Sequence, residues 1–238
     1  VAYLSNFTKI YIGKQTPHVL KKIKYYLRNN KSNVVYPNTW RLVKKGNTFY
    51  YRDKNNYLKL NTKNVYSKGM RENICHAIKI ALDLNIKKKI IQNILPSLSF
   101  EGRFHYLNKG KIKNKLFKKE TIMIDGAHSP ADSLNLYSYL KTVKLPIYGI
   151  WAMSKNKEPD AFIKNLKGIF KKIVTMPIEN DLNSVSANEL YKIAIKNNFI
   201  SEKSKNFLDA LKKISSKEEK LIVCFGSLYN CGNILNKN

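Results

Sequence analysis

The chain of 238 residues has little of several features that define common protein classes. Its three cysteines, Cys75, Cys224 and Cys231, form no CxxC pair, so neither a disulfide framework nor a zinc motif is indicated. No apolar run approaches the ~18 residues that a membrane-spanning helix needs. The first residues lack the charged start and apolar core of a signal peptide. We therefore expect reduced thiols, no membrane partner and a cytoplasmic location.

Acidic residues are also scarce, because 16 Asp and Glu face 44 Lys and Arg and leave a net charge of +28. Such charge raises the affinity for any polyanion, and a basic nucleic-acid-binding protein is one alternative. However, the basic residues are scattered apart from the stretch Lys109–Lys119, and no signature of an RNA- or DNA-binding fold is present. Abundant Lys, Asn, Ile and Tyr together are typical of an AT-rich genome. We expect no specific nucleic acid as a partner.

The second half of the chain alternates between β-rich runs and helical patterns. The expected strands are 121–124, 147–153, 172–177 and 221–225, and the expected helices are 131–141, 160–170, 187–197, 204–214 and 228–235. Ser186 and Glu189 form a capping box at the start of the third helix. Strands separated by helices imply right-handed crossovers. This alternation predicts an α/β fold, a Rossmann-like and mostly parallel sheet with helices on both faces.

The first half has a different pattern. A strand at 7–12 precedes the N-cap residue Thr16, Pro17 and a helix to about Asn29. Four short β-rich runs then suggest a small antiparallel meander, at 33–36, 40–44, 48–52 and 57–60. An apolar helical stripe starts at Met70, and a second helix at 86–94 ends before Pro96. The break at 96–99 predicts two domains, 1–100 and 101–238.

The stretch from Thr121 to Pro130 carries the clearest chemical signal. An apolar run stops at Asp125-Gly126, and His128 and Pro130 then open a helix. In an alternating α/β domain this junction is the carboxyl end of a strand, where ligands bind. The start of the following helix attracts phosphate groups. The junction therefore predicts a carboxylate and an imidazole at the edge of the sheet.

Six short motifs, in order from about residue 65 onward, resemble those of folylpolyglutamate synthases and dihydrofolate synthases, relatives of the Mur ligases. Met70–Ala77 resembles His-Gln-x-x-Asn-Ala, Glu101–Phe104 resembles Pro-Gly-Arg-Phe, and Asp125–Pro130 resembles Asp-Gly-Ala-His-Asn-Pro. Met153–Glu158 resembles Met-x-Lys-Asp-Lys-Asp, Ser186–Leu190 resembles Ser-x-Glu-Glu-Leu, and Gly226–Tyr229 resembles Gly-Ser-Leu-Tyr. The resemblance implies that residues 101–238 are a Mur ligase C-terminal domain. It also implies that residues 1–100 are the remnant of a central ATPase domain.

The same resemblance implies an ATP-dependent, amide-forming ligase that adds L-glutamate to folate or dihydropteroate. ATP first turns the carboxylate into an acyl phosphate, which needs a phosphate cradle and Mg²⁺. No G-x-x-x-x-G-K-[ST] motif occurs in the chain, because Gly13-Lys14 is followed by Gln15. A missing G-x-G-x-x-G after any strand also argues against a free-standing dinucleotide-binding module. We expect an incomplete enzyme with no metal ligands of its own, and a separate N-terminal chain is a candidate partner.

Four residues are candidates for the site. The resemblance implies that Arg103, Asp125 and Asn73 bind the nucleotide, and a guanidinium offers a planar fork of donors to phosphate oxygens. His128 is the catalytic candidate, because it could orient a carboxylate or phosphate at the helix start. The ordinary alternatives are a surface Arg103, a turn-forming Asp125, and helix caps at Asn73 and His128.

The chain departs from the family pattern at three places. Ser129 replaces an Asn, Arg71–Asn73 alters the Gln-x-x-Asn spacing, and Asn183 stands where family members carry an Arg.

Overall fold

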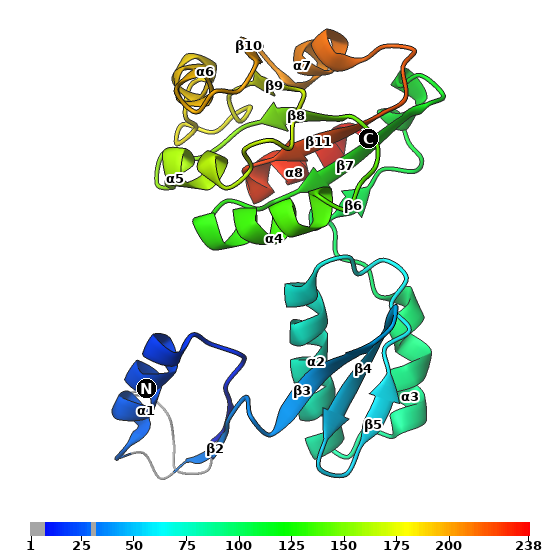
Figure 1. Ribbon diagram of the computed structural model, residues 1–238, viewed down its shortest axis with the longest axis vertical. Helices are drawn as coiled ribbons and strands as arrows, with labels where there is room; N and C mark the ends of the chain where they lie inside the picture. The colour runs from blue at the N-terminus through cyan, green and yellow to red at the C-terminus, as the bar shows by residue number, and fades with distance from the viewer. Residues whose placement is uncertain (1–7, 30–31) are drawn as a thin grey trace. The chain divides into compact units, whose positions relative to one another are not determined.

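The computed structural model describes residues 8–29 and 32–238 (Figure 1). The chain divides into two compact units, Val1–Leu98 and Ser99–Asn238, called unit 1 and unit 2 below. The predicted first strand would start at Phe7, which lies outside the described residues. Within the described ranges, no helix is both long and apolar enough to cross a membrane.

Unit 1 begins with a short parallel pair of strands. β1 (Lys9–Tyr11) is followed by α1 (Pro17–Leu27) and then by β2 (Asn33–Val35), which pairs with β1 in parallel. The Thr16 side chain caps α1 by accepting the N–H of Val19, as the sequence predicts. The predicted four-stranded meander is wrong in its first strand. The crossover through α1 brings β2 beside β1 in the same direction, so β2 leaves the meander.

The remaining strands of unit 1 form an antiparallel meander covered by helices. Its elements are β3 (Trp40–Lys45), β4 (Thr48–Asp53), β5 (Tyr57–Lys59), α2 (Lys68–Asp83), α3 (Lys88–Ile94) and a 3₁₀ turn at Leu95–Ser97. The apolar stripe of α2 packs on this sheet, where Tyr51, Ile74 and Cys75 are buried together.

Unit 2 contains a six-stranded sheet with the order β10-β9-β8-β11-β7-β6. The strands are β6 (His105–Tyr106), β7 (Glu120–Asp125), β8 (Ile147–Trp151), β9 (Lys172–Thr175), β10 (Ser201–Lys203) and β11 (Lys220–Phe225). All neighbours pair in parallel except β6, which is antiparallel to β7. The predicted, mostly parallel sheet is confirmed. The edge strands β6 and β10 were not predicted, because they are short and mostly polar.

Helices cover both faces of this sheet. They are α4 (Pro130–Leu140), α5 (Pro159–Lys164), α6 (Ala187–Lys196), α7 (Phe207–Ile214) and α8 (Leu228–Lys237), and one 3₁₀ turn at Lys113–Lys115 precedes β7. α4, α5 and α6 pack against one another in sequence, while α7 lies on β8 and β9 and α8 on β11 and β7. The helix predicted at 160–170 ends at Lys164, because the chain then turns through Gly168 at φ +80°.

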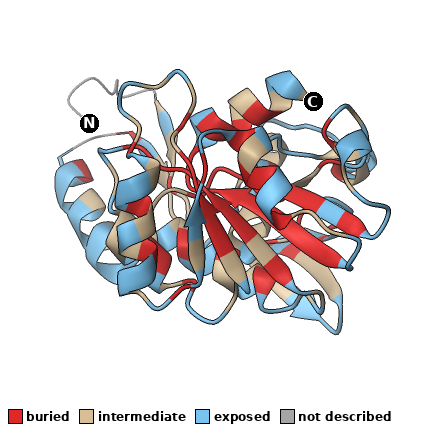
Figure 2. Ribbon diagram, turned by 90° about the horizontal axis from the view of Figure 1, so that it is seen from above, coloured by how far each residue is buried: buried red, intermediate tan, exposed pale blue. Residues whose placement is uncertain are grey.

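Alternate strand residues serve two cores, and the inner strands of the unit 2 sheet are mostly buried (Figure 2). Ile124, Ile150 and Cys224 pack with side chains of α7 and α8. On the other face, the rings of Trp151, Phe162 and Phe225 stack on one another. A central strand that is buried on both faces explains the uninterrupted apolar run before Asp125.

Candidate functional site

The carboxyl ends of β9, β8, β11 and β7 lie side by side along one edge of the unit 2 sheet, which we call the carboxyl edge. Asp125 ends β7, Trp151 ends β8 and Phe225 ends β11, and these residues occupy equivalent register positions. The predicted position of Asp125 is therefore confirmed. Ligands of open α/β sheets bind outside such an edge, which makes it the candidate site.

The Asp125 carboxylate is buried and joins two loops. Asp125 is only 1% exposed to solvent. One oxygen accepts the N–H of Phe104 at 2.8 Å, and the other accepts the N–H of Ala127 at 2.8 Å. Burial raises the pKa of Asp125 to about 6, against the opposing effects of these two donors and the Arg103 charge. The side chain thus faces the protein, which differs from the open carboxylate that the sequence suggests.

Arg103 lies on the first of these two loops. Gly102, at φ +68°, allows the turn, and its carbonyl accepts the N–H of Gly126 at 2.6 Å. The Arg103 side chain is half-buried, and its guanidinium forms no hydrogen bond or ion pair with any residue that the structure describes. Since the guanidinium donates no hydrogen bond within the described residues, its N–H groups are available to an anion, and Arg103 can hold a phosphate or a carboxylate.

His128 lies on the second loop, with one ring nitrogen engaged. Its Nδ1 is 2.7 Å from the carbonyl oxygen of Gly126. Because a carbonyl only accepts, Nδ1 carries the proton in a neutral ring, and Nε2 remains as an acceptor. His128 does not cap α4, because the Ser129 hydroxyl accepts the N–H of Asp132 at 3.2 Å. Ser129 thus fills the capping role at the position where family members carry Asn.

Asn73 belongs to unit 1, whereas the other three candidates belong to unit 2. It lies exposed on α2, several residues after the helix start. The cap of α2 is Ser67, whose hydroxyl accepts the N–H of Met70 at 3.1 Å. The structure therefore excludes the ordinary interpretation of Asn73 as a helix cap. Of the four candidates, Arg103, Asp125 and His128 lie on or next to the same pair of loops in unit 2.

No metal centre is evident in the part of the chain that the structure describes. Within residues 8–29 and 32–238, no group of three or more His, Cys, Asp or Glu side chains is placed to hold a metal ion. The described residues thus offer no all-protein cage for the Mg²⁺ that the resemblance implies.

Gly226 and Ser227 at the carboxyl edge were given no role by sequence reasoning. Gly226 has φ +104°, and its backbone packs against the buried ring of Trp151 and the carbonyl of Ala152. The Ser227 hydroxyl caps α8 by accepting the N–H of Asn230 at 3.3 Å. The Gly-Ser-Leu-Tyr motif that starts at Gly226 was the available signal, because a glycine between a strand and a helix often marks a special backbone conformation.

Unit 2 should become more stable as the pH falls from 7 to 5. The pKa of Asp125 is about 6 in the folded chain against an ordinary value of 3.8, so between these values only the folded state binds the proton. Stability then rises by up to about 1.4 kcal/mol per pH unit as the pH falls within this window. Carboxyl groups of unit 2 with a lowered pKa, such as Asp160 at about 2, change their contribution to stability only below this pH window.

Urea unfolding at pH 7 and pH 5 measures this effect. The variant Asp125→Asn carries no titrating group at this position and serves as the control. Its free energy of unfolding should change less than that of the wild type between the two pH values, by about 1 kcal/mol. An equal change in both proteins would show that Asp125 is not a costly buried charge.

A family model for the C-terminal domain of dihydrofolate synthetase matches residues 108–237, which lie within unit 2. Comparison with curated proteins gave no match. Among solved structures, the folylpolyglutamate synthase of Mycobacterium tuberculosis complexed with ADP matches with a TM-score of 0.83 and 14% identity, over 96% of this chain and 54% of that chain. The folylpolyglutamate synthase of Thermotoga maritima matches with a TM-score of 0.71 and 22% identity, over 95% of this chain and 53% of that one.

A third structure, the bifunctional folylpolyglutamate/dihydrofolate synthase of Yersinia pestis complexed with AMPPNP and a Mn ion, has a TM-score of 0.76 and 13% identity, over 96% of this chain and 52% of that one. At these identities the likeness shows the fold alone. The chain spans about half the length of the solved structures that it matches. Because the family model covers more than half of its residues, the chain belongs to the dihydrofolate synthetase family, in which it corresponds to the C-terminal part.

Proposed function

We propose that the chain is the C-terminal half of an ATP-dependent ligase that adds L-glutamate to folate or dihydropteroate. The observation that carries this proposal is the Arg103 guanidinium, which donates no hydrogen bond to any described residue and belongs to the carboxyl edge of a sheet of this family. The solved structures support it, because relatives are described as complexes with ADP, with AMPPNP and Mn, and with L-glutamate. The cytoplasm, with its reduced thiols, is the location that we propose.

We further propose that unit 2 is the Mur ligase C-terminal domain and unit 1 the end of the central ATPase domain. The matched structures cover about 96% of this chain, and thus both units, while only about half of each matched chain is covered. The chain also lacks the G-x-x-x-x-G-K-[ST] motif that cradles phosphates. The phosphate loop and the Mg²⁺ ligands would then belong to the half that this chain does not contain.

Within this division, the described residues supply electrostatic help from one side of the nucleotide. Bound ATP would supply the phosphoryl group that activates the acceptor carboxylate. Arg103 would hold phosphate oxygens and stabilise the negative charge that develops on them, which is the main protein contribution to phosphoryl transfer. His128 Nε2 would orient a donor group of a substrate. Asn73, which belongs to unit 1, remains a separate candidate for nucleotide binding. The overall positive charge favours anionic substrates and needs no nucleic acid as its explanation.

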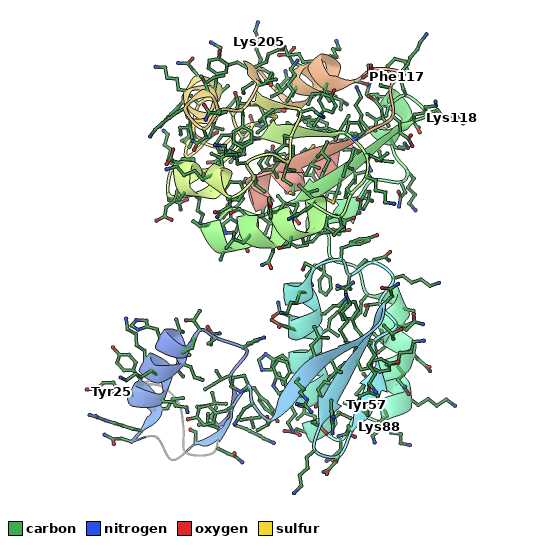
Figure 3. The ribbon with its side chains drawn as sticks, in the orientation of Figure 1. Tyr25, Tyr57, Lys88, Phe117, Lys118 and Lys205 are labelled. Atoms are coloured by element: carbon green, nitrogen blue, oxygen red, sulfur yellow. The ribbon has the colours of Figure 1, made fainter. Side chains whose placement is uncertain are left out.

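Arg103→Ala should lower kcat/KM for ligation by at least about 100-fold in a completed enzyme, because one charged donor to the transition state is lost. The completed enzyme is this chain fused behind the N-terminal half of the Thermotoga maritima synthase, and ADP release with glutamate and dihydropteroate or folate is measured. The matched control is Lys118→Ala, which removes one positive charge from the loop before β7, at the opposite edge of the sheet (Figure 3). Equal activities of the two variants would refute the role of Arg103.

A further inference from the structure

The turn that carries Arg103 has a strained backbone. Phe104 has φ +47° and Gly102 has φ +68°, so Arg103 lies between two left-handed residues. Glycine adopts this conformation freely, but for a residue with a side chain it costs about 1–2 kcal/mol. Such strain persists only where the surrounding structure fixes it, and it concentrates at functional sites. A turn that only connected two segments could have avoided this cost with glycine at position 104.

Hydrogen bonds hold the backbone of this turn from one side. The N–H of Phe104 donates to the Asp125 carboxylate at 2.8 Å, and the Gly102 carbonyl accepts the N–H of Gly126 at 2.6 Å. Both bonds tie the turn to the carboxyl end of β7, an inner strand of the sheet. Because the other Asp125 oxygen accepts the N–H of Ala127, the carboxylate is itself fixed in place.

The ring of Phe104 is held from a second side. Phe104 is only 6% exposed, and its ring meets the Tyr139 ring edge-on, with centroids 5.1 Å apart and an interplanar angle of 83°. Tyr139 comes from α4, and its hydroxyl is 2.7 Å from the hydroxyl of Tyr106 on β6. Edge-to-face pairs of this kind contribute about 0.5–1.5 kcal/mol beyond the area that they bury. Backbone and ring together are thus able to offset the strain at Phe104.

We propose that Asp125 and Tyr139 are positioning residues that hold Phe104 in its strained conformation and thereby fix Arg103 at the carboxyl edge. Neither needs to touch a substrate, since each acts through Phe104. We call these two residues, with their contacts to Phe104, the clamp. Its role in nucleotide binding rests on the contact proposed above for Arg103. The clamp explains why Asp125 is buried although it ends a strand at a ligand-binding edge.

The order of the Arg103 backbone tests the clamp directly in the 238-residue chain. The ¹H–¹⁵N NOE of the Arg103 backbone amide reports motion on the picosecond to nanosecond timescale. Order should be lost in Tyr139→Leu and in Phe104→Gly, and it should persist in Tyr139→Phe, which keeps the ring. Tyr137→Leu, the same change elsewhere on α4, is the matched control and should leave Arg103 ordered. If Tyr139→Leu does not fold, Phe104→Gly decides, because glycine fits φ +47° without strain.

An Arg103 backbone that is equally ordered in the wild type, Tyr139→Leu and Phe104→Gly would overturn the proposal, and so would a disordered Arg103 backbone in the wild type. Titration of the completed enzyme with ADP separates the clamp from the proposed function. If the unclamped turn is competent one-fifth of the time, the apparent Kd rises about fivefold. An unchanged Kd in Arg103→Ala would disprove the nucleotide contact alone. A raised Kd in Arg103→Ala with an unchanged Kd in Tyr139→Leu would disprove the clamp.

Discussion

Gly226→Ala is expected to unfold unit 2 or to lower its melting temperature by about 10 °C or more. A Cβ at this position would lie 2.3 Å from the carbonyl oxygen of Ala152 and 2.7 Å from a ring atom of Trp151. Neither neighbour can move easily, because one is backbone and the other is a fully buried side chain. The φ of +104° adds strain for any residue with a side chain. Overpacking and strain together amount to roughly 3–5 kcal/mol, a large share of the stability of a domain.

Thermal unfolding followed by circular dichroism measures this effect, and Gly232→Ala is its matched control. Gly232 lies within α8, and a Cβ there would meet no atom within 4 Å. Because alanine favours a helix over glycine by about 1 kcal/mol, Gly232→Ala should be neutral or stabilising. A Gly226→Ala chain as stable as the wild type would contradict the close packing of Gly226 against Trp151 and Ala152.

Much of unit 2 could be predicted from local pattern. The apolar runs that became β7, β8, β9 and β11 are buried on both faces, and such strands are recognisable as short uninterrupted runs. The expected cap at Ser186 is present, since its hydroxyl accepts the N–H of Glu189 at 3.2 Å. Caps and apolar runs depend on neighbouring residues, which is why the sequence alone reveals them.

Contacts between distant residues could not be predicted in this way. Asp125 has the sequence context of an exposed turn, yet it is buried and accepts the N–H of Phe104, 21 residues earlier. Glu120 follows the lysine-rich stretch Lys109–Lys119, yet it is fully buried and accepts hydrogen bonds from Ser215 and Ser216, which lie 95 and 96 residues later. No local periodicity encodes such pairs. The site candidates were therefore found by motif, while the clamp around Arg103 required the structure.

The 238-residue chain alone should show no ATP-dependent ligation of glutamate. In the proposed function, Arg103 and His128 contact the substrates from unit 2 alone, and the chain contains no phosphate-binding loop motif. Loss of that loop removes the backbone donors and the lysine that stabilise charge on the transferred phosphoryl group. Removing even one donor of this kind typically lowers the rate by about 10²–10³-fold, so the loss of the whole loop should place turnover below detection.

The measurement that tests the half-enzyme account most directly is a ligation assay run in parallel on the chain alone and on the completed enzyme. Both reactions contain ATP, Mg²⁺, L-glutamate and either dihydropteroate or folate, and the product is identified by its added glutamate mass. A sample of the chain expressed in a host that lacks its own synthase excludes contamination. The account predicts product from the completed enzyme and none from the chain alone. Glutamate addition by the unsupplemented chain would contradict it.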